Sequence, residues 1–408
     1  MQATHPGVAE QDRMELVGYH DLERRPAFKI AMQEIGGRWF VYLSHFWHSG
    51  WTIVDVTDPS DPQMVRFVEG PPNTETTQIQ VAEGRMLVSL ERPLEEVYGK
   101  VEGHDSGIQI YDVKSDPSTP YLLGSWKGDA VGTHRNFYAG GDVAYLCAKV
   151  EGWAGQILVA LDVSDPHQPR ELSRWWWPGQ HLEAGEEPTY GFYFHGPAYV
   201  EGTRAYLSYG RLGAIILDVS DPREPRFISR IDLGDLGSRL GCHSAVPIPE
   251  RDLLVVNSEA ILEGYDDPLG YAVTVDISDE TRPRVIGWLP RPQPARHTGY
   301  RNYQEKGGRY GPHNQAHHQR QGVFRRLQNT VLLTYFNAGL RVFDIEDPYN
   351  PNEVGYFVPE DPRERLGAMP RGRLVSQTED VVVDARGYIY CTDKNHGLFI
   401  LRYEGELT

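Results

Sequence analysis

Six apolar segments along the chain end in the same dipeptide, Asp followed by Val or Ile, and a turn rich in Asp, Ser and Pro follows each one. Proline presets φ, and Asp and Ser side chains hydrogen-bond to their own backbone, so these residue types favour a tight turn. The shared residues lie 50 to 68 positions apart, at Asp55, Asp112, Asp162, Asp218, Asp276 and Asp344. A degenerate seventh copy covers 397–405.

The residues between these turns predict strands, because short apolar runs alternate with turn signals and helical periodicity is lacking. One strand leads into each turn and a second follows it, as in 225–231. Two more strands lie upstream, as in 194–202 and 203–209. Four-stranded antiparallel units repeated seven times predict an all-β fold, a seven-bladed β-propeller.

The ends of the chain indicate how the ring closes within a single domain over 1–408. The last unit stops after its third strand, while 14–20 read like the fourth strand of the preceding unit at 352–358. We therefore predict that 14–20 complete the last blade, which removes exposed sheet edges. The blades are expected at 27–68, 75–126, 133–177, 194–232, 242–289, 312–358 and 378–403.

The repeating Asp-Val/Ile-Ser-Asp-Pro units resemble the LVIVD-repeat family of seven-bladed propellers. The resemblance extends over nearly the whole chain and implies the propeller fold. It implies little about activity, because propellers host unrelated functions.

Composition limits the partners and the compartment. Acidic residues number 57 against 40 basic ones, a formal net charge of −17, so we expect neither nucleic acid nor an anionic membrane as a partner. Three cysteines, an odd number at distant positions, favour a reducing cytoplasm. The first twenty residues lack the apolar stretch of a signal peptide, which also leads us to expect a cytoplasmic protein.

Alignment of the blades places histidines at one height around the central axis. Innermost strands line that axis, so their equivalent positions form a ring. Blade seven contributes Glu379 to this ring, and blades one and two contribute Lys29 and Thr77. Blades three to six each contribute a histidine, namely His134, His195, His243 and His313.

Four imidazoles from separate rigid strands predict a divalent metal site, since imidazole is the commonest ligand for several transition metals. The alternative is a set of structural histidines inherited through repeat duplication. The Asp-Pro turns recur in nearly all blades, whereas His recurs in only four with differing neighbours, which favours the metal. Glu379 and Lys29 are predicted to be catalytic, as axial groups that move protons or bind substrate.

This layout is similar to that of carotenoid-cleavage-type oxygenases, which hold non-haem iron with four histidines from separate blades and supporting carboxylates. It is also similar to that of oligogalacturonate lyases, which hold manganese with three histidines and a glutamine. The local motifs of both families are absent. The four-histidine resemblance implies Fe(II), with Cu, Mn or Zn as alternatives.

Two enlarged loops lead to histidine-bearing strands, 175–194 before His195 and 290–311 before His313. Long loops on a rigid scaffold are usually functional, and the first of these is strongly aromatic. An aromatic mouth above a metal favours an apolar or aromatic small molecule, although the rings would alternatively pack between blades. The predicted substrate-binding residues are Trp47, Trp177, Tyr190, Phe192, Phe194, Gln315 and His317.

Three functions remain open from the sequence. The first is a non-haem iron oxygenase or other oxidoreductase. The second is a lyase, isomerase or hydrolase that uses the metal as a Lewis acid. The third is a propeller that binds a protein partner without catalysis. Carboxylates near strand ends, such as Glu75, Glu91 and Glu259, show no spacing that singles out a glycosidase pair. The sequence leaves the oligomeric state open.

Overall fold

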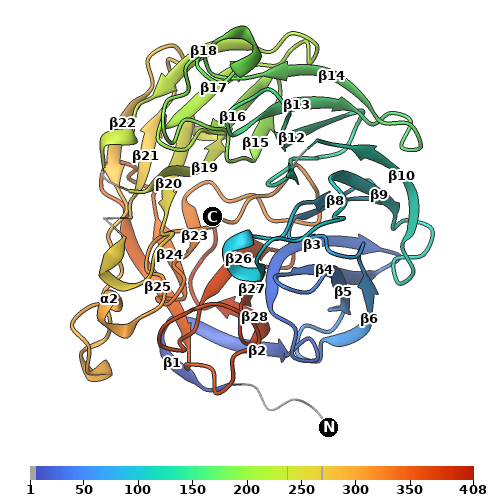
Figure 1. The fold of residues 1–408 in the computed structure, drawn as a ribbon. Coiled ribbons are helices and arrows are strands. Elements are labelled where there is room, and N and C mark those ends of the chain that lie inside the picture. The colour runs from blue at the N-terminus through green and yellow to red at the C-terminus, as the bar shows by residue number, and fades with distance from the viewer. Residues whose placement is uncertain (1–5, 130, 237, 268–269) are drawn as a thin grey trace.

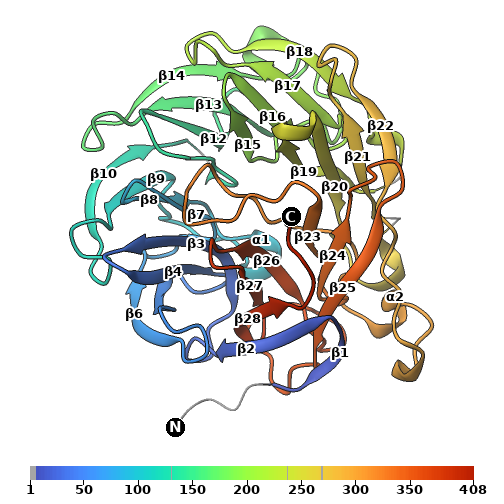
Figure 2. The same ribbon diagram turned by 180° about the vertical axis from the view of Figure 1, so that it is seen from behind.

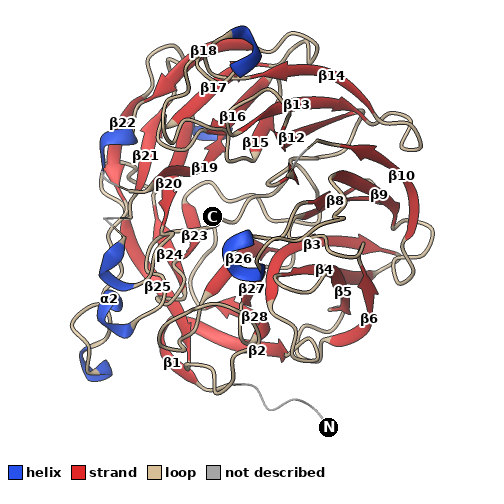
Figure 3. Cartoon of the chain, in the orientation of Figure 1, coloured by secondary structure: helices blue, strands red, loops and turns tan. Residues whose placement is uncertain are grey.

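Seven β-sheets surround a central axis in the computed structural model of the protein (Figures 1 and 2). The structure describes residues 6–129, 131–236, 238–267 and 270–408. Strands make up nearly all of the regular structure, and the chain visits the sheets in sequence order around the ring (Figure 3). Each sheet has four antiparallel strands. The predicted all-β, seven-bladed propeller is therefore confirmed.

Most blades are built from four consecutive strands. Blade 1 contains β3 (Ala27–Ile35), β4 (Arg38–His45), β5 (Gly50–Asp55) and β6 (Gln63–Glu69), and blade 2 contains β7 (Ile79–Ala82), β8 (Arg85–Leu90), β9 (Gly107–Asp112) and β10 (Tyr121–Lys127). Blade 3 contains β11 (Gly132–Thr133), β12 (Val143–Lys149), β13 (Gln156–Asp162) and β14 (Arg170–Trp175). Blade 4 contains β15 (Ala198–Glu201), β16 (Arg204–Ser208), β17 (Ala214–Asp218) and β18 (Arg226–Ile231). Blade 5 contains β19 (Leu240–Ile248), β20 (Leu253–Glu259), β21 (Ala272–Asp276) and β22 (Arg284–Trp288).

The N-terminal segment joins the last two blades. Blade 6 contains β23 (Thr330–Thr334), β24 (Leu340–Asp344) and β25 (Asn352–Pro359), and blade 7 contains β26 (Thr378–Val383), β27 (Tyr388–Asp393) and β28 (Gly397–Tyr403). Strand β2 (Met14–His20) pairs with β28, as expected for 14–20. Strand β1 (Val8–Asp12) pairs with β25 in addition, which the sequence did not predict. Within the described ranges the α-helices are α1 (Glu95–Tyr98) and α2 (Tyr303–Lys306). None of the helices there is long and apolar enough to cross a membrane.

The repeated Asp explains why the third strand of a blade ends where it does. In the first six blades its carboxylate accepts a hydrogen bond from the backbone N–H two residues later, over 2.7 to 2.9 Å. The Asp therefore turns its own backbone out of the sheet. Local chemistry alone produces this turn, which is why its recurrence was visible in the sequence.

Apolar side chains pack between neighbouring blades and hold them rigidly. One cluster joins Leu158 of β13, Ile216 of β17 and Val273 of β21, and all three are fully buried. Close packing of this kind resists small displacements. Residues on separate inner strands therefore keep a constant spacing across the axis.

The inner strands are irregular where the candidate ring lies. The pairing register shifts between Leu240 and Ser244 in β19, between Thr378 and Val381 in β26, and between Ala27 and Ile30 in β3. Extra residues of this kind redirect side chains and are frequent next to functional sites. The shifts place His243, Glu379 and Lys29 within irregular backbone.

Candidate metal centre

The structure brings the four predicted histidines together. The ring centroids of His134 and His195 are 5.2 Å apart, those of His195 and His243 are 5.1 Å apart, and those of His243 and His313 are 4.6 Å apart. His134 follows β11, His195 precedes β15, and His243 lies in β19. His313 donates its backbone N–H to Thr334 at the end of β23. Four consecutive blades thus each contribute one imidazole to a single cluster.

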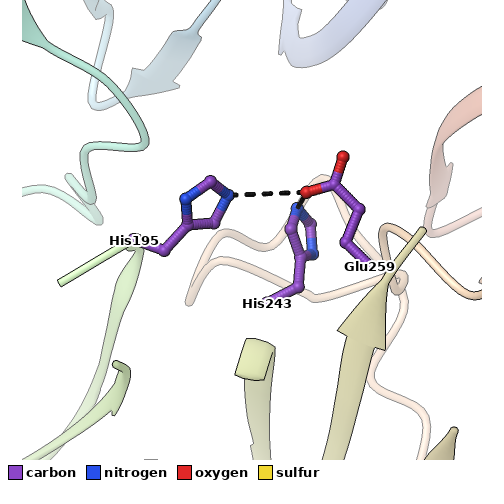
Figure 4. A group of neighbouring side chains, drawn as sticks. All are labelled: His195, His243 and Glu259. Atoms are coloured by element: carbon purple, nitrogen blue, oxygen red, sulfur yellow. Dashed lines mark ion pairs between the residues drawn. The ribbon is translucent and has the colours of Figure 1, made fainter. Parts of the chain in front are cut away.

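Glu259, the last residue of β20, lies beside His195 and His243 (Figure 4). Its carboxylate oxygens are 3.7 Å from Nε2 of His195, 3.5 Å from Nε2 of His243 and 3.8 Å from Nε2 of His313. These separations are too long for good hydrogen bonds. They suit atoms that share one metal ion, because ligand atoms each about 2.1 Å from the metal lie about 3 to 4 Å from one another. The sequence did not select Glu259, which stands on a second strand and has no counterpart in the aligned ring.

Hydrogen bonds at Nδ1 leave the Nε2 atoms free for a metal. Nδ1 of His134 is 2.7 Å from a carboxylate oxygen of Glu91, and Nδ1 of His313 is 2.8 Å from the backbone carbonyl of Glu379. Both partners only accept hydrogen bonds, so Nδ1 carries the proton and Nε2 keeps its lone pair. An acceptor behind the ligand ring is the usual support of metal-binding histidines.

Most of the cluster is held in the neutral form that binds metals. Burial, reinforced by the positive charge of Arg135, lowers the pKa of His195, His243 and His313 well below the ordinary value. Burial also opposes the charge on His134, but the neighbouring Glu91 outweighs it and raises the pKa of that imidazole. Three of the four imidazoles therefore need no deprotonation at neutral pH before they coordinate a cation.

Glu379 lies beside the cluster in a buried charge network. Its carboxylate pairs with Lys394, and its other oxygen is 3.5 Å from Nδ1 of His313. Nη1 of Arg309 is 3.3 Å from Glu259. Burial raises the pKa of Glu379 to about 7 and lowers that of Lys394. A carboxyl group that titrates near neutrality is suited to proton transfer.

Burial raises the pKa of Glu259 too, and a further carboxyl group with a raised pKa, Glu75, lies near His134. Glu75 pairs through its backbone with Glu91, the partner of His134. Burial, together with the charge of Glu91, raises the pKa of Glu75 to about 8. Glu75 is therefore mostly protonated at pH 7, while Glu91 accepts from His134.

Lys29, Gln315 and His317 lie elsewhere along the axis. They line a small polar cavity together with Arg135 and Tyr199. Nζ of Lys29 is 2.7 Å from Asp380, and the Gln315 amide donates to Asn257 and to the carbonyl of Val255. Lys29 and Gln315 are therefore engaged with neighbouring side chains and backbone groups.

The predicted aromatic residues are dispersed. Phe194 is fully buried and stacks on Tyr209 between blades, and Trp177 packs against Phe227 on the outer strand β18. Phe192 packs at the edge of the same core as Phe194. Tyr190 is exposed beside Arg211, and Trp47 contacts Phe46.

Other aromatic rings contact the histidines. Phe336 stacks on His313 with a centroid separation of 4.6 Å, and Phe28 lies 6.2 Å from the same ring. The ring of Tyr193 is 6.2 Å from that of His195. None of these three was among the predicted substrate-binding residues, although Tyr193 lies in the aromatic loop at 175–194.

A second histidine group has the opposite hydrogen-bonding pattern. Nε2 atoms of His317 and His318 lie 3.7 and 3.3 Å from Glu201. Nδ1 of each ring accepts a backbone N–H, from Gln319 and Arg320 respectively. Nδ1 must then be unprotonated, so the neutral rings carry their proton on Nε2 and point it at the carboxylate. In this form the Nε2 proton of His318 faces Glu201 at 3.3 Å, whereas Nε2 of His317, at 3.7 Å, is too distant for a good hydrogen bond.

Comparisons with known proteins concern the fold. A family model described as LVIVD repeat matches residues 40–69, which run from β4 to β6. Blade 1 contains an LVIVD repeat. The solved structure titled "Structure of U3-55K" is similar over 97% of this chain and 99% of that chain, with a TM-score of 0.58 and 8% identity, a likeness that shows the fold alone. No curated protein matches the sequence.

The position of Glu259 predicts a role in metal binding. We expect Glu259→Gln, which keeps the shape and removes the charge, to weaken Co(II) binding at least tenfold, the scale on which supporting groups affect metal sites. Competition with a chromophoric chelator measures this. Glu201→Gln, at the second histidine group, is the matched control and should leave the affinity unchanged. Equal affinity of both variants would show that Glu259 serves only to pair with Arg309.

Proposed function

We propose that this protein is a metal-dependent oxidoreductase with a divalent transition metal held on the propeller axis by His134, His195, His243 and His313, with Glu259 as a further ligand. The observation that carries the proposal is the convergence of the Nε2 atoms of His195, His243 and His313 on Glu259, combined with proton acceptors behind His134 and His313. Nitrogen-rich donor sets suit iron, copper and zinc better than magnesium or calcium. Once bound, an iron or copper ion would supply one-electron and O₂ chemistry.

Iron(II) is our first assignment. Four histidines from consecutive blades, with Glu91 behind one of them, resemble the layout of the four-histidine non-haem iron oxygenases. We also propose that the other Asp-Val/Ile turns belong to LVIVD repeats like that of blade 1. The substrate is proposed to be a small organic molecule with apolar or aromatic character, because Phe28, Phe336 and Tyr193 border the imidazoles. We place the protein in the cytoplasm, where its thiols would stay reduced.

In this proposal the protein's own groups shape the site and move protons. The aromatic rings exclude water from one side of the cluster. Glu379, with a pKa near 7, would exchange a proton with substrate while Lys394 stabilises its charged form. The polar cavity that contains Lys29 would take no direct part, because Lys29 is paired with Asp380.

A second candidate is a lyase, isomerase or hydrolase in which the metal polarises a carbonyl group. The presence of two carboxyl groups with pKa values of about 7 and 8, Glu379 and Glu75, favours it. Groups of this kind exchange protons efficiently at neutral pH. Here Glu379 would act as the base and Glu75 as a protonated donor.

Metal content and oxygen dependence test the proposal. Protein purified without chelators or an affinity tag should contain close to one iron or copper ion per chain by inductively coupled plasma mass spectrometry. Candidate aromatic substrates should then accelerate O₂ uptake in an oxygen electrode. Bound zinc or manganese with O₂-independent turnover would select the second candidate. Failure to take up any metal on reconstitution would refute both and favour a protein-binding propeller.

A further inference from the structure

One arginine contacts all three neighbouring histidine-bearing segments from within the propeller. Arg135 directly follows His134 and is almost completely buried. Its Nη1 donates to the backbone carbonyl of Gly196, the residue after His195, over 2.5 Å, and to the backbone carbonyl of His243. Its Nη2 donates to Ser244 Oγ over 3.0 Å and to Asn314 Oδ1 over 3.1 Å. The guanidinium of blade 3 is thus bonded to blades 4, 5 and 6.

Two of these acceptors also connect Arg135 to histidine rings, one directly and one through a shared backbone carbonyl. Ser244 Oγ, which accepts from Arg135, is 3.0 Å from Nδ1 of His243. Asn314 accepts from Arg135 with its oxygen and donates with its nitrogen to the carbonyl of Glu379, over 3.0 Å. That same carbonyl accepts from Nδ1 of His313. Arginine cannot accept a hydrogen bond, so it fixes the orientation of the Asn314 amide, whose oxygen must face Arg135.

The planar guanidinium is suited to this task. Its donors point in fixed directions, so the four bonds define the relative positions of segments from four blades. The backbone around the cluster is irregular, as in β19, where the pairing register shifts beside His243. Regular sheet hydrogen bonds therefore do not set the spacing of the rings there. The four acceptors are neutral oxygens, so this buried cation has no carboxylate among its hydrogen-bond partners, which is costly. Such a cost suggests a role beyond packing.

We propose that Arg135 is the positioning residue of the metal centre, a central brace that holds the four histidine-bearing segments at the spacing required by one metal ion. This inference rests on the proposed function. It assigns Arg135 no contact with metal or substrate. Its effect on the metal is exerted through the positions of His195, His243 and His313.

Arg135→Lys and Arg135→Met test the brace with Co(II) as the probe. Lysine keeps the charge but cannot make four fixed bonds, and methionine keeps only the apolar length. We expect the dissociation constant for Co(II) to rise about 10- to 100-fold in both variants, as for other groups that orient ligands. The visible absorption bands of bound Co(II) should shift, because they report the coordination geometry.

Arg341→Lys is the matched control, because Arg341 is equally buried but bonds to Ala338, Tyr303 and Glu353, residues outside the histidine cluster. It should lower the melting temperature and leave the Co(II) affinity and spectrum unchanged. If the Arg135 variants fail to fold, Ser244→Ala and Asn314→Ala remove the receiving groups and should each shift the Co(II) spectrum. Wild-type affinity and spectrum in folded variants would overturn the brace while the metal centre stands. A wild-type protein that binds no Co(II) would overturn both.

Discussion

His243→Ala is expected to abolish stoichiometric metal binding. His243 occupies the middle of the cluster, with rings of His195 and His313 on either side at centroid separations of 5.1 and 4.6 Å. Its Nε2 is also the closest of the measured imidazole nitrogens to Glu259, at 3.5 Å. Alanine at this position removes a nitrogen donor from the middle of the cluster, and water fills the space that the imidazole leaves. We expect metal content per chain to fall from about one to below about one tenth after gel filtration.

The control for this experiment is another buried histidine with no place in the cluster. His45 is fully enclosed in blade 1, where its two ring nitrogens bond to the carbonyl of Pro26 and the hydroxyl of Thr52 at 2.9 and 2.8 Å. His45→Ala should destabilise the fold yet keep the metal. Equal metal content in His243→Ala and the wild type, with the variant folded by circular dichroism, would refute the assignment of the centre.

Lys394→Met is expected to cause the largest loss of stability among the single substitutions considered. Lys394 and Glu379 form an ion pair in which both side chains are almost completely buried. Removing one partner of such a pair leaves an uncompensated charge, which costs about 3–5 kcal/mol. Chemical denaturation at pH 8 measures the change in the free energy of unfolding. The exposed pair of Arg24 and Glu364 is the control, since Arg24→Met should change it by less than about 1 kcal/mol.

The loss in Lys394→Met should depend on pH in a defined direction. The pKa of Glu379 in the folded protein, about 7, already lies above its ordinary value, and loss of Lys394 would raise it further. A carboxyl group with a raised folded pKa contributes stability at low pH and loses it as the pH rises through that pKa. The destabilisation should therefore be greater at pH 8 than at pH 5.

A double variant separates two causes of the lost stability, namely the unpaired charge of Glu379 and the lost packing of the Lys394 side chain. In Lys394→Met/Glu379→Gln neither charge remains, so much of the stability at pH 8 should return. A double variant that stays as unstable as Lys394→Met would show that the loss comes from packing around Phe46 and Phe336, which flank the lysine.

Much of the fold was predictable, because it is encoded in short stretches of chain. Each Asp that ends a third strand forms its own turn, because its carboxylate accepts a hydrogen bond from the backbone N–H two residues later. Six such turns at similar spacing indicate a repeated sheet. The strand-like segment at 14–20 indicates that the N-terminus supplies the missing strand of the last blade and so closes the ring. The additional strand β1 was not predictable, since its pairing with β25 joins residues about 350 positions apart.

The histidines of the centre were found by the same repetition, because equivalent positions in a ring of blades face one axis. Counting residues cannot find Glu259, which reaches the cluster from a second strand. Nor can it show that His317 and His318 carry their protons on Nε2, since that follows from backbone N–H groups at Gln319 and Arg320. Both facts depend on contacts that do not repeat from blade to blade, so the repeat in the sequence cannot reveal them.

The sequence by itself thus determined the blades, their number, the closing strand at 14–20 and the height at which four imidazoles meet. Each of these follows from local turn chemistry and from a period that is repeated along the chain. The tertiary structure alone decided which carboxylate lies among the imidazoles, which ring nitrogens are free and that Arg135 joins four blades. These depend on bulged strands and on bonds between blades, where a shift of one residue changes the direction of a side chain.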